Sequence, residues 1–278
     1  MEDSHHRFDL HIHTEYSDGT CTPEQVVRMA SRAKLNMIAI SDHDTVSGVR
    51  DAVKCGEEEG VLVIPSVEFD NEWSHELHIM GLDIDLNHPV LIRAMEVARE
   101  RRDKRNAVII SKLLDNGIDI GPFMQGGKSA TTKLHIAQAL IRSGYATEVK
   151  EAFAKYLRPG TIGYYTEKRF TPQQVLEIIY RADGIPVLAH PCHIRENFHG
   201  LLRELVSMGL LGIEAFYPTN TSRQTEMYLS VARQHKLIVT CGSDFHGANR
   251  PGVPLGCAWR PNAVLEKTYE LLIRRTES

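Results

Sequence analysis

The sequence has no apolar run approaching the roughly 20 residues that a transmembrane helix needs. Its first residues, Met1–His6, are polar and lack the apolar stretch of a signal peptide. The five cysteines are an odd number and include no C-x-x-C pair, which argues against a disulfide framework. We therefore expect a cytoplasmic protein without a membrane partner.

A basic excess is also missing, because 32 Lys and Arg residues stand against 36 Asp and Glu residues, for a net charge of −4. Proteins that bind duplex nucleic acid usually carry a strong positive charge, since phosphate contacts dominate their affinity. We therefore expect no duplex nucleic-acid partner. Hydrophobic residues make up 42% and charged residues 24%, which is the profile of a globular protein and excludes a mainly disordered chain.

Short apolar runs alternate with helical patterns, which favours βα units around a parallel sheet or barrel. Helix starts are marked by Thr22-Pro23 and Thr171-Pro172, each followed by a glutamine that can complete a capping box. The expected strands are Phe8–His13, Met37–Ser41, Leu62–Val67, Leu77–Leu82, Pro186–Ala189, Gly212–Phe216 and Leu237–Cys241.

The middle of the chain, residues 84–184, predicts a helical insertion between two barrel segments, residues 7–83 and 185–278. The charged run Arg99–Arg105 is interpreted as a solvated helix face and not as a phosphate site. The loop that ends in Lys128-Ser129 lacks the frame of a P-loop. Helices are expected over Leu91–Asn116, Lys133–Ser143 and Glu148–Leu157.

Histidines and carboxylates lie at or near the ends of several expected strands. In the first strand, period-two alternation places Asp9, His11 and His13 on one face. Strand ends of a parallel barrel open on one rim, and so many buried polar groups would be costly without a cation. The other side chains of this kind are His43, Asp44, Glu68, His78, His190, Asp244 and His246.

This set of ligands contains no cysteine. Imidazole suits zinc, iron and manganese, whereas many carboxylates favour harder ions such as manganese. The ligands are too many for one ion, and they suit two or three divalent ions with a bridging carboxylate. Such multinuclear sites activate a water and neutralise the oxygens of an in-line displacement at phosphorus.

At this point the residues resemble the PHP (polymerase and histidinol phosphatase) family of metal-dependent phosphoesterases. The resemblance implies an α/β fold, a distorted seven-stranded (β/α) barrel with a helical cap insertion. The matching segments, in order along the chain, are D-L-H-I-H-T at Asp9–Thr14, S-D-G at Ser17–Gly19, S-D-H-D at Ser41–Asp44, V-E at Val67-Glu68, H-I-M-G at His78–Gly81, A-H-P at Ala189–Pro191 and G-S-D-F-H at Gly242–His246.

The resemblance also implies how the ligands are shared. One metal would take His11, His13, Glu68 and Asp244. A second would share Glu68 and add His78 and His190, and a third would take Asp18, His43 and His246. Asp44 would contact the substrate or a metal-bound water, and His75 would form part of the pocket wall or support a ligand.

The insertion resembles the cap of small-molecule PHP phosphatases, which include enzymes acting on nucleoside 3′,5′-bisphosphates and on RNA 5′-ends. In that pattern Lys133, His135 and Lys155 would bind a second phosphate, although Lys133 stands where arginine is expected. The alternative for these residues is a structural or solvent-facing role.

We therefore expect hydrolysis of a phosphomonoester, with a small phosphorylated substrate such as a nucleoside 3′,5′-bisphosphate, by attack of a metal-bound hydroxide. One alternative enzyme is a phosphodiesterase that acts on a cyclic phosphate or trims short RNA from its 5′-end. A non-enzymatic alternative is a metal-stabilised binding module that has lost activity. The sequence leaves the oligomeric state open.

Overall fold

The computed structural model describes residues 5–73, 77–194 and 197–277. In these ranges a seven-stranded sheet has its strands in sequence order, and most neighbouring strands are parallel. The first strand meets the segment that follows the last strand through an Ile12–Phe245 bridge, which nearly closes the sheet into a barrel. The strands are β1 (Phe8–Ile12), β2 (Met37–Ile40), β3 (Leu62–Asp70), β4 (His78–Leu82), β5 (Ile185–Leu188), β6 (Gly212–Phe216) and β7 (Ile238–Cys241).

The strand β4 departs from the predicted parallel arrangement, because it runs antiparallel to both β3 and β5. The prediction of a parallel barrel is therefore wrong at this strand. The reversed direction places His78, the first residue of β4, opposite Asp70, the last residue of β3. The same pairing extends β3 beyond its predicted end at Val67, so that Glu68 lies within the strand.

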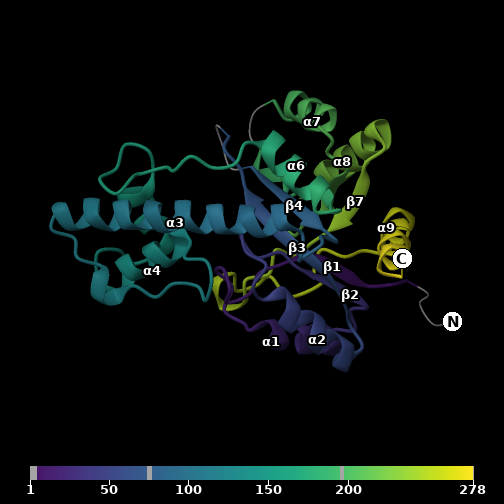
Figure 1. The fold of residues 1–278 in the computed structure, drawn as a ribbon, viewed down its shortest axis with the longest axis horizontal. Helices are drawn as coiled ribbons and strands as arrows, with labels where there is room; N and C mark the ends of the chain where they lie inside the picture. Colours follow the sequence, from purple (N-terminus) through teal and green to yellow (C-terminus); the bar gives the residue numbers. More distant parts are fainter. Residues whose placement is uncertain (1–4, 74–76, 195–196, 278) are drawn as a thin grey trace.

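Helices cover the outside of the sheet, with α1 and α2 on one side and α6, α7 and α8 on another (Figure 1). The capping boxes predicted at Thr22 and Thr171 are both present, and Thr221 forms a further one. None of the helices in the described ranges is long and apolar enough to cross a membrane. The covering helices are α1 (Pro23–Arg32), α2 (Val49–Glu59), α6 (Pro172–Arg181), α7 (Phe198–Ser207), α8 (Ser222–His235) and α9 (Ala263–Thr276).

The helical insertion extends away from the barrel along α3 (Pro89–Asp115), and α4 (Lys133–Arg142) packs beside it (Figure 1). As predicted, no strand occurs between residues 83 and 183, all of which are described. The limits 84–184 stay a prediction. The start of α3 and the apolar face of α6, which lie inside these limits, pack on the barrel core. The insertion has an apolar cluster of its own, which includes Ile109, Leu113, Ile136, Leu140 and Leu157. The third predicted helix divides into α5 (Val149–Ala152) and the π-helical η2 (Phe153–Leu157).

The charged run on α3 is only partly a solvated face. Arg102 and Arg105 are 5% and 4% exposed, whereas Arg99, Asp103 and Lys104 are exposed. The two buried arginines continue the helical stripe that buries Ala98 and Ile109, and this spacing places them on the inner side of the helix. The interpretation as a solvated face is therefore wrong for these two arginines.

Candidate metal centre

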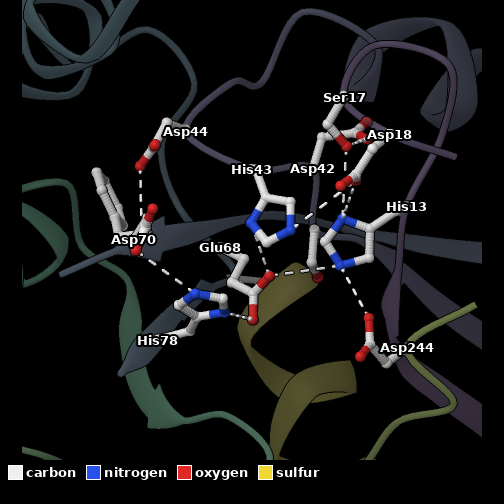
Figure 2. A network of polar contacts seen from close by, with 12 residues as sticks. His13, Ser17, Asp18, Asp42, His43, Asp44, Glu68, Asp70, His78 and Asp244 are labelled. Carbon is white, nitrogen blue, oxygen red and sulfur yellow. Dashed lines mark hydrogen bonds and ion pairs between the residues drawn. The ribbon is translucent and has the colours of Figure 1, made fainter. Parts of the chain in front are cut away.

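The nine predicted metal ligands converge at one rim of the barrel. Eight of them are buried, and His43 is partly exposed. The Glu68 carboxylate lies at the centre, between His43 on one side and His78 on the other (Figure 2). The predicted convergence thus includes His78, which comes from the start of its strand, whereas the other ligands follow strand ends or lie within strands.

Two groups of candidate ligands meet at the Glu68 carboxylate. In the first, the Nε2 atoms of His11 and His13 are 3.1 Å apart, and Asp244 Oδ1 lies 3.2 Å from His13 Nε2. In the second, His78 Nδ1 and His190 Nε2 are 3.2 Å apart, and each lies 3.0 Å from Glu68 Oε1. One carboxylate therefore contacts both groups, which is the geometry of a bridging ligand.

A third group surrounds Asp18, whose side chain follows β1 in a loop. Its Oδ1 atom lies 3.2 Å from His246 Nε2 and 3.9 Å from His43 Nε2. This oxygen is buried, and it accepts no hydrogen bond from the residues that the structure describes. A buried carboxylate oxygen without a donor is costly, and a cation would satisfy it.

The spacing within these groups fits divalent metal ions. Ligand bonds of about 2.1 Å at angles between 90° and 110° place neighbouring ligand atoms roughly 3.0–3.4 Å apart. The nitrogen–nitrogen distances of 3.1 Å and 3.2 Å lie in that range. Two imidazole nitrogens facing each other share at most one proton, so an ion is the better partner. The assignment of each ligand to an ion stays a prediction.

The charges in the cluster depend on one another. Burial acts to raise the pKa of Glu68, but the charges of His78 and His11 hold it well below its usual value. Burial and the neighbouring imidazoles of His246 and His43 lower the pKa of His13 to about 3. Burial acts against protonation of His246, yet its contact with Asp18 and the charge of Asp244 raise its pKa to about 9. The imidazole of His246 and the carboxylate of Glu68 thus have pKa values shifted toward their charged forms, whereas the pKa of His13 is shifted toward the neutral form.

The sequence interpretation gave no role to Glu214, which is fully buried in β6. Its Oε1 atom lies 3.1 Å from His11 Nδ1, and its Oε2 accepts a hydrogen bond of 2.7 Å from the backbone N–H of His190. His190 has a φ of 25°, a conformation that is unfavourable for residues other than glycine. Glu214 therefore orients two candidate ligands from different strands. The sequence does offer a signal that could have identified Glu214, namely a glutamate within a short apolar strand.

Asp244 is held in a similar way by groups outside the predicted set. Tyr217 donates a hydrogen bond of 2.8 Å to Asp244 Oδ2, and Arg250 also binds this oxygen. The other oxygen, Oδ1, faces His13. These contacts fix which oxygen is turned toward the cluster.

Asp44, the predicted catalytic residue, lies beside the cluster, and its carboxylate forms an ion pair with Arg102 of α3. Its other oxygen accepts a hydrogen bond of 3.2 Å from the backbone N–H of Asp70 (Figure 2). Contact of Asp44 with substrate stays a prediction. His75 lies outside the described residues.

The three predicted phosphate ligands have different surroundings. Lys133 is partly buried and lines a cavity together with His78. His135 is buried, and its Nδ1 accepts a hydrogen bond of 2.9 Å from the backbone N–H of Thr132, as in a capping box. The Lys155 side chain is 54% exposed and forms an ion pair with Glu151. The structure therefore places Lys133 in a cavity that reaches His78 of the cluster, whereas the contacts of Lys155 are on the cap.

Comparison with known proteins gives consistent matches. The family model for the PHP domain matches residues 9–113. The chain is 33% identical over 270 residues to the 5′-3′ exoribonuclease Rnm of Escherichia coli (strain K12), covering 92% of this chain and 91% of that protein. It is 30% identical to a phosphoribosyl 1,2-cyclic phosphate 1,2-diphosphodiesterase of Eggerthella lenta, covering 86% of this chain and 94% of that protein.

A 3′,5′-nucleoside bisphosphate phosphatase of Chromobacterium violaceum is 29% identical, with 89% of this chain and 90% of that protein covered. A solved amidohydrolase structure with bound sulfate, from the same species, superimposes with a TM-score of 0.85 at 27% identity, covering 97% of this chain and 96% of the other. The chain therefore belongs to the PHP family of metal-dependent phosphoesterases, and it is a hydrolase.

Proposed function

We propose that this chain hydrolyses a phosphomonoester of a nucleoside 3′,5′-bisphosphate. The observation that carries the proposal is a cavity of about 540 Å³ that is lined by both His78 of the metal cluster and the ammonium-bearing Lys133. One phosphate would lie at the cluster, and the other would lie beside Lys133. A substrate with two phosphates would occupy both of these positions.

We infer that two to three divalent ions, with manganese as the first candidate and zinc or iron as alternatives, bind the nine ligands. Bound there, they would supply an activated water and neutralise the phosphate oxygens. The side chains of the protein orient the ligands: Glu214 holds His11 and the backbone of His190, and Tyr217 holds Asp244. In the reaction water adds to phosphorus, the ester P–O bond breaks, and the leaving alcohol takes up a proton.

The charges around Lys133 support a second phosphate position beside this residue. Among the residues that the structure describes, its ammonium has no ion pair or hydrogen bond. Burial lowers the pKa of Lys133, and the positive charges of Arg169 and Arg105 lower it further. Arg105 pairs with Glu167 and Arg169 with Asp70, and these carboxylates offset part of the repulsion. Lys133 is the cation of the three without an ion pair in the described part of the chain, so an anionic ligand would supply its counter-charge.

A phosphate-release assay on the manganese-loaded protein tests the proposal. We expect a nucleoside 3′,5′-bisphosphate to exceed the matching monophosphate in kcat/KM by at least tenfold, since a charge-assisted contact contributes about 1.5–3 kcal/mol. Lys133→Ala should reduce that ratio about tenfold or more. Lys104→Ala, which removes an exposed lysine from α3, is the matched control. Equal rates on mono- and bisphosphate would contradict the proposal.

Removal of nucleotides from an RNA 5′-end is a second candidate, because the 33% identity to the Escherichia coli exoribonuclease extends over 92% of this chain. The internucleotide phosphate of RNA occupies the same 3′-position as the second phosphate of the bisphosphate. The substrate panel therefore includes a short 5′-phosphorylated oligoribonucleotide and a ribose cyclic phosphate. Faster turnover of either diester than of any monoester would favour the phosphodiesterase.

A further inference from the structure

The cavity beside the metal cluster has an aromatic part that the phosphate contacts do not explain. Besides His78, two cationic side chains and the carboxylates of Asp70, Glu72 and Glu167, its lining contains three aromatic rings, those of Trp73, Phe153 and Tyr164. Trp73 follows β3 of the barrel, whereas Phe153 begins η2 of the cap and Tyr164 lies between η2 and α6. The barrel and the cap thus both contribute aromatic rings to one space. Its volume of about 540 Å³ is in the range of small-ligand sites.

Trp73 is the most informative of these rings. It is 39% exposed, although tryptophan is the largest apolar side chain. The other tryptophan of the chain, Trp259, packs against the barrel core. An exposed ring in a cavity that also holds cations is typical of sites for planar, phosphorylated ligands.

We propose that this cavity binds the nucleobase of the substrate, with Trp73 as a stacking surface and Phe153 and Tyr164 as further apolar walls. The inference rests on the proposed function, because it assumes that the reacting phosphate lies at the cluster next to His78. Lys133 lines the same cavity and complements a phosphate, whereas Arg169 is paired with Asp70 there, and the aromatic rings complement the base. Because every base offers a π-face, we expect little discrimination among the four bases.

Tryptophan fluorescence measures this contact without relying on catalysis. The metal-loaded protein is titrated with a substrate analogue as the probe. This probe is an adenosine derivative in which a 5′-phosphonate, with a P–C bond, replaces the 5′-phosphate ester. We expect it to quench the emission of Trp73, whereas inorganic phosphate and ribose 5-phosphate should leave the emission unchanged. In Trp73→Phe the quenching should disappear, and Trp259 remains as the internal reference.

Variants separate stacking from a general effect on the fold. In calorimetric titration with the phosphonate, Trp73→Ala should raise Kd by at least about fivefold, the lower end of base–aromatic stacking. Trp73→Phe keeps an aromatic face and should bind within about twofold of wild type. Tyr180→Ala removes a ring that is 75% exposed on α6 and serves as the matched control.

The outcomes distinguish this inference from the proposed function. Equal quenching by ribose 5-phosphate would mean that the cavity binds the sugar phosphate, and this would overturn the base site. No quenching by the phosphonate, together with continued phosphate release from the bisphosphate, would overturn the base site and leave the proposed function intact. Quenching confined to the base-containing probe, without any hydrolysis, would support the base site and refute the phosphatase.

Discussion

Glu68 contacts five histidines, and we therefore expect this carboxylate to matter more than its neighbours. Its oxygens lie between 3.0 and 3.4 Å from nitrogens of His11, His13, His43, His78 and His190. The surrounding positive charges keep the pKa of this buried carboxyl well below its usual value. The side chain is therefore an anion that several histidines share.

Glu68→Gln should remove at least one metal equivalent and lower kcat by about 100-fold or more, since even residues that only support metal ligands are worth 10–100-fold. The amide keeps the size of the side chain but loses the charge that two ions would share. Elemental analysis of the wild type should give two to three equivalents. Glu57→Gln, on the exposed face of α2, is the control. Near-wild-type turnover of Glu68→Gln would remove Glu68 from the ligand set.

Lys133 and Lys155 illustrate how identical residues acquire different surroundings. Lys133 lies in a cavity beside two arginines, and its pKa is lowered by burial and by their charge. Lys155 is exposed, and its hydrogen bond to Glu151 raises its pKa. A sequence motif can place both on cap helices but cannot determine which of the two faces the cavity.

Among the elements, the segment from Gln125 to Ala130 connects the cap to the metal centre. The backbone N–H groups of Lys128 and Ala130 donate to the carbonyls of Glu15 and Tyr16, at 2.7 and 2.8 Å. These residues belong to the loop after β1 that also carries Asp18. The cap is therefore attached directly to the loop that supplies a candidate ligand.

At Gly127 this segment lies very close to the backbone of the loop after β1. A Cβ atom there would lie 2.0 Å from the carbonyl oxygen of Ser17 and 2.4 Å from that of Ala130, so the backbone would have to move. We expect Gly127→Ala to displace the Asp18 loop, lower stability by about 1–3 kcal/mol and reduce activity. Denaturant unfolding and the phosphate-release assay measure the two effects.

Gly121→Ala is the matched control, because its Cβ would meet only a side-chain oxygen of Asp119, at 3.2 Å. It lies in the same connection between α3 and α4. If both variants behaved like wild type, the close approach at Gly127 would not constrain the loop.

At the scale of the whole molecule, the metal centre joins the two ends of the barrel. His11 comes from β1, and Asp244 and His246 follow β7. Backbone hydrogen bonds of 2.9 Å connect Asp244 to His11 and His13 to Phe245. Ions bound to ligands from both ends of the sheet would therefore stabilise its closure.

Metal removal should accordingly destabilise the entire fold. An ion present at about 1,000 times its Kd stabilises by about 4 kcal/mol, and each kcal/mol shifts Tm by roughly 2–4 °C in a protein of this size class. We expect Tm to fall on the order of 10 °C after chelation and to recover when manganese is restored. An unchanged Tm in protein that elemental analysis finds free of metal would contradict this coupling.

The sequence by itself determined the strands, the capped helices and the ligand types. Local signals suffice here: period-two alternation marks β1, and the Thr-Pro-x-Gln pattern marks the starts of α1 and α6. The fold class and the family followed from motifs that keep their order along the chain. These features depend on residues that are close in sequence, so pattern and spacing can predict them.

Only the tertiary structure decided features that depend on distant residues. The antiparallel direction of β4 follows from its pairing with β3 and β5, and no property of its own five residues specifies it. Arg102 becomes buried because α3 lies over the rim of the barrel, where Asp44 provides a counter-charge. Glu214 acquires its role because strands far apart in sequence bring His11 and His190 to it. Contacts across the fold create these environments, and local patterns do not encode them.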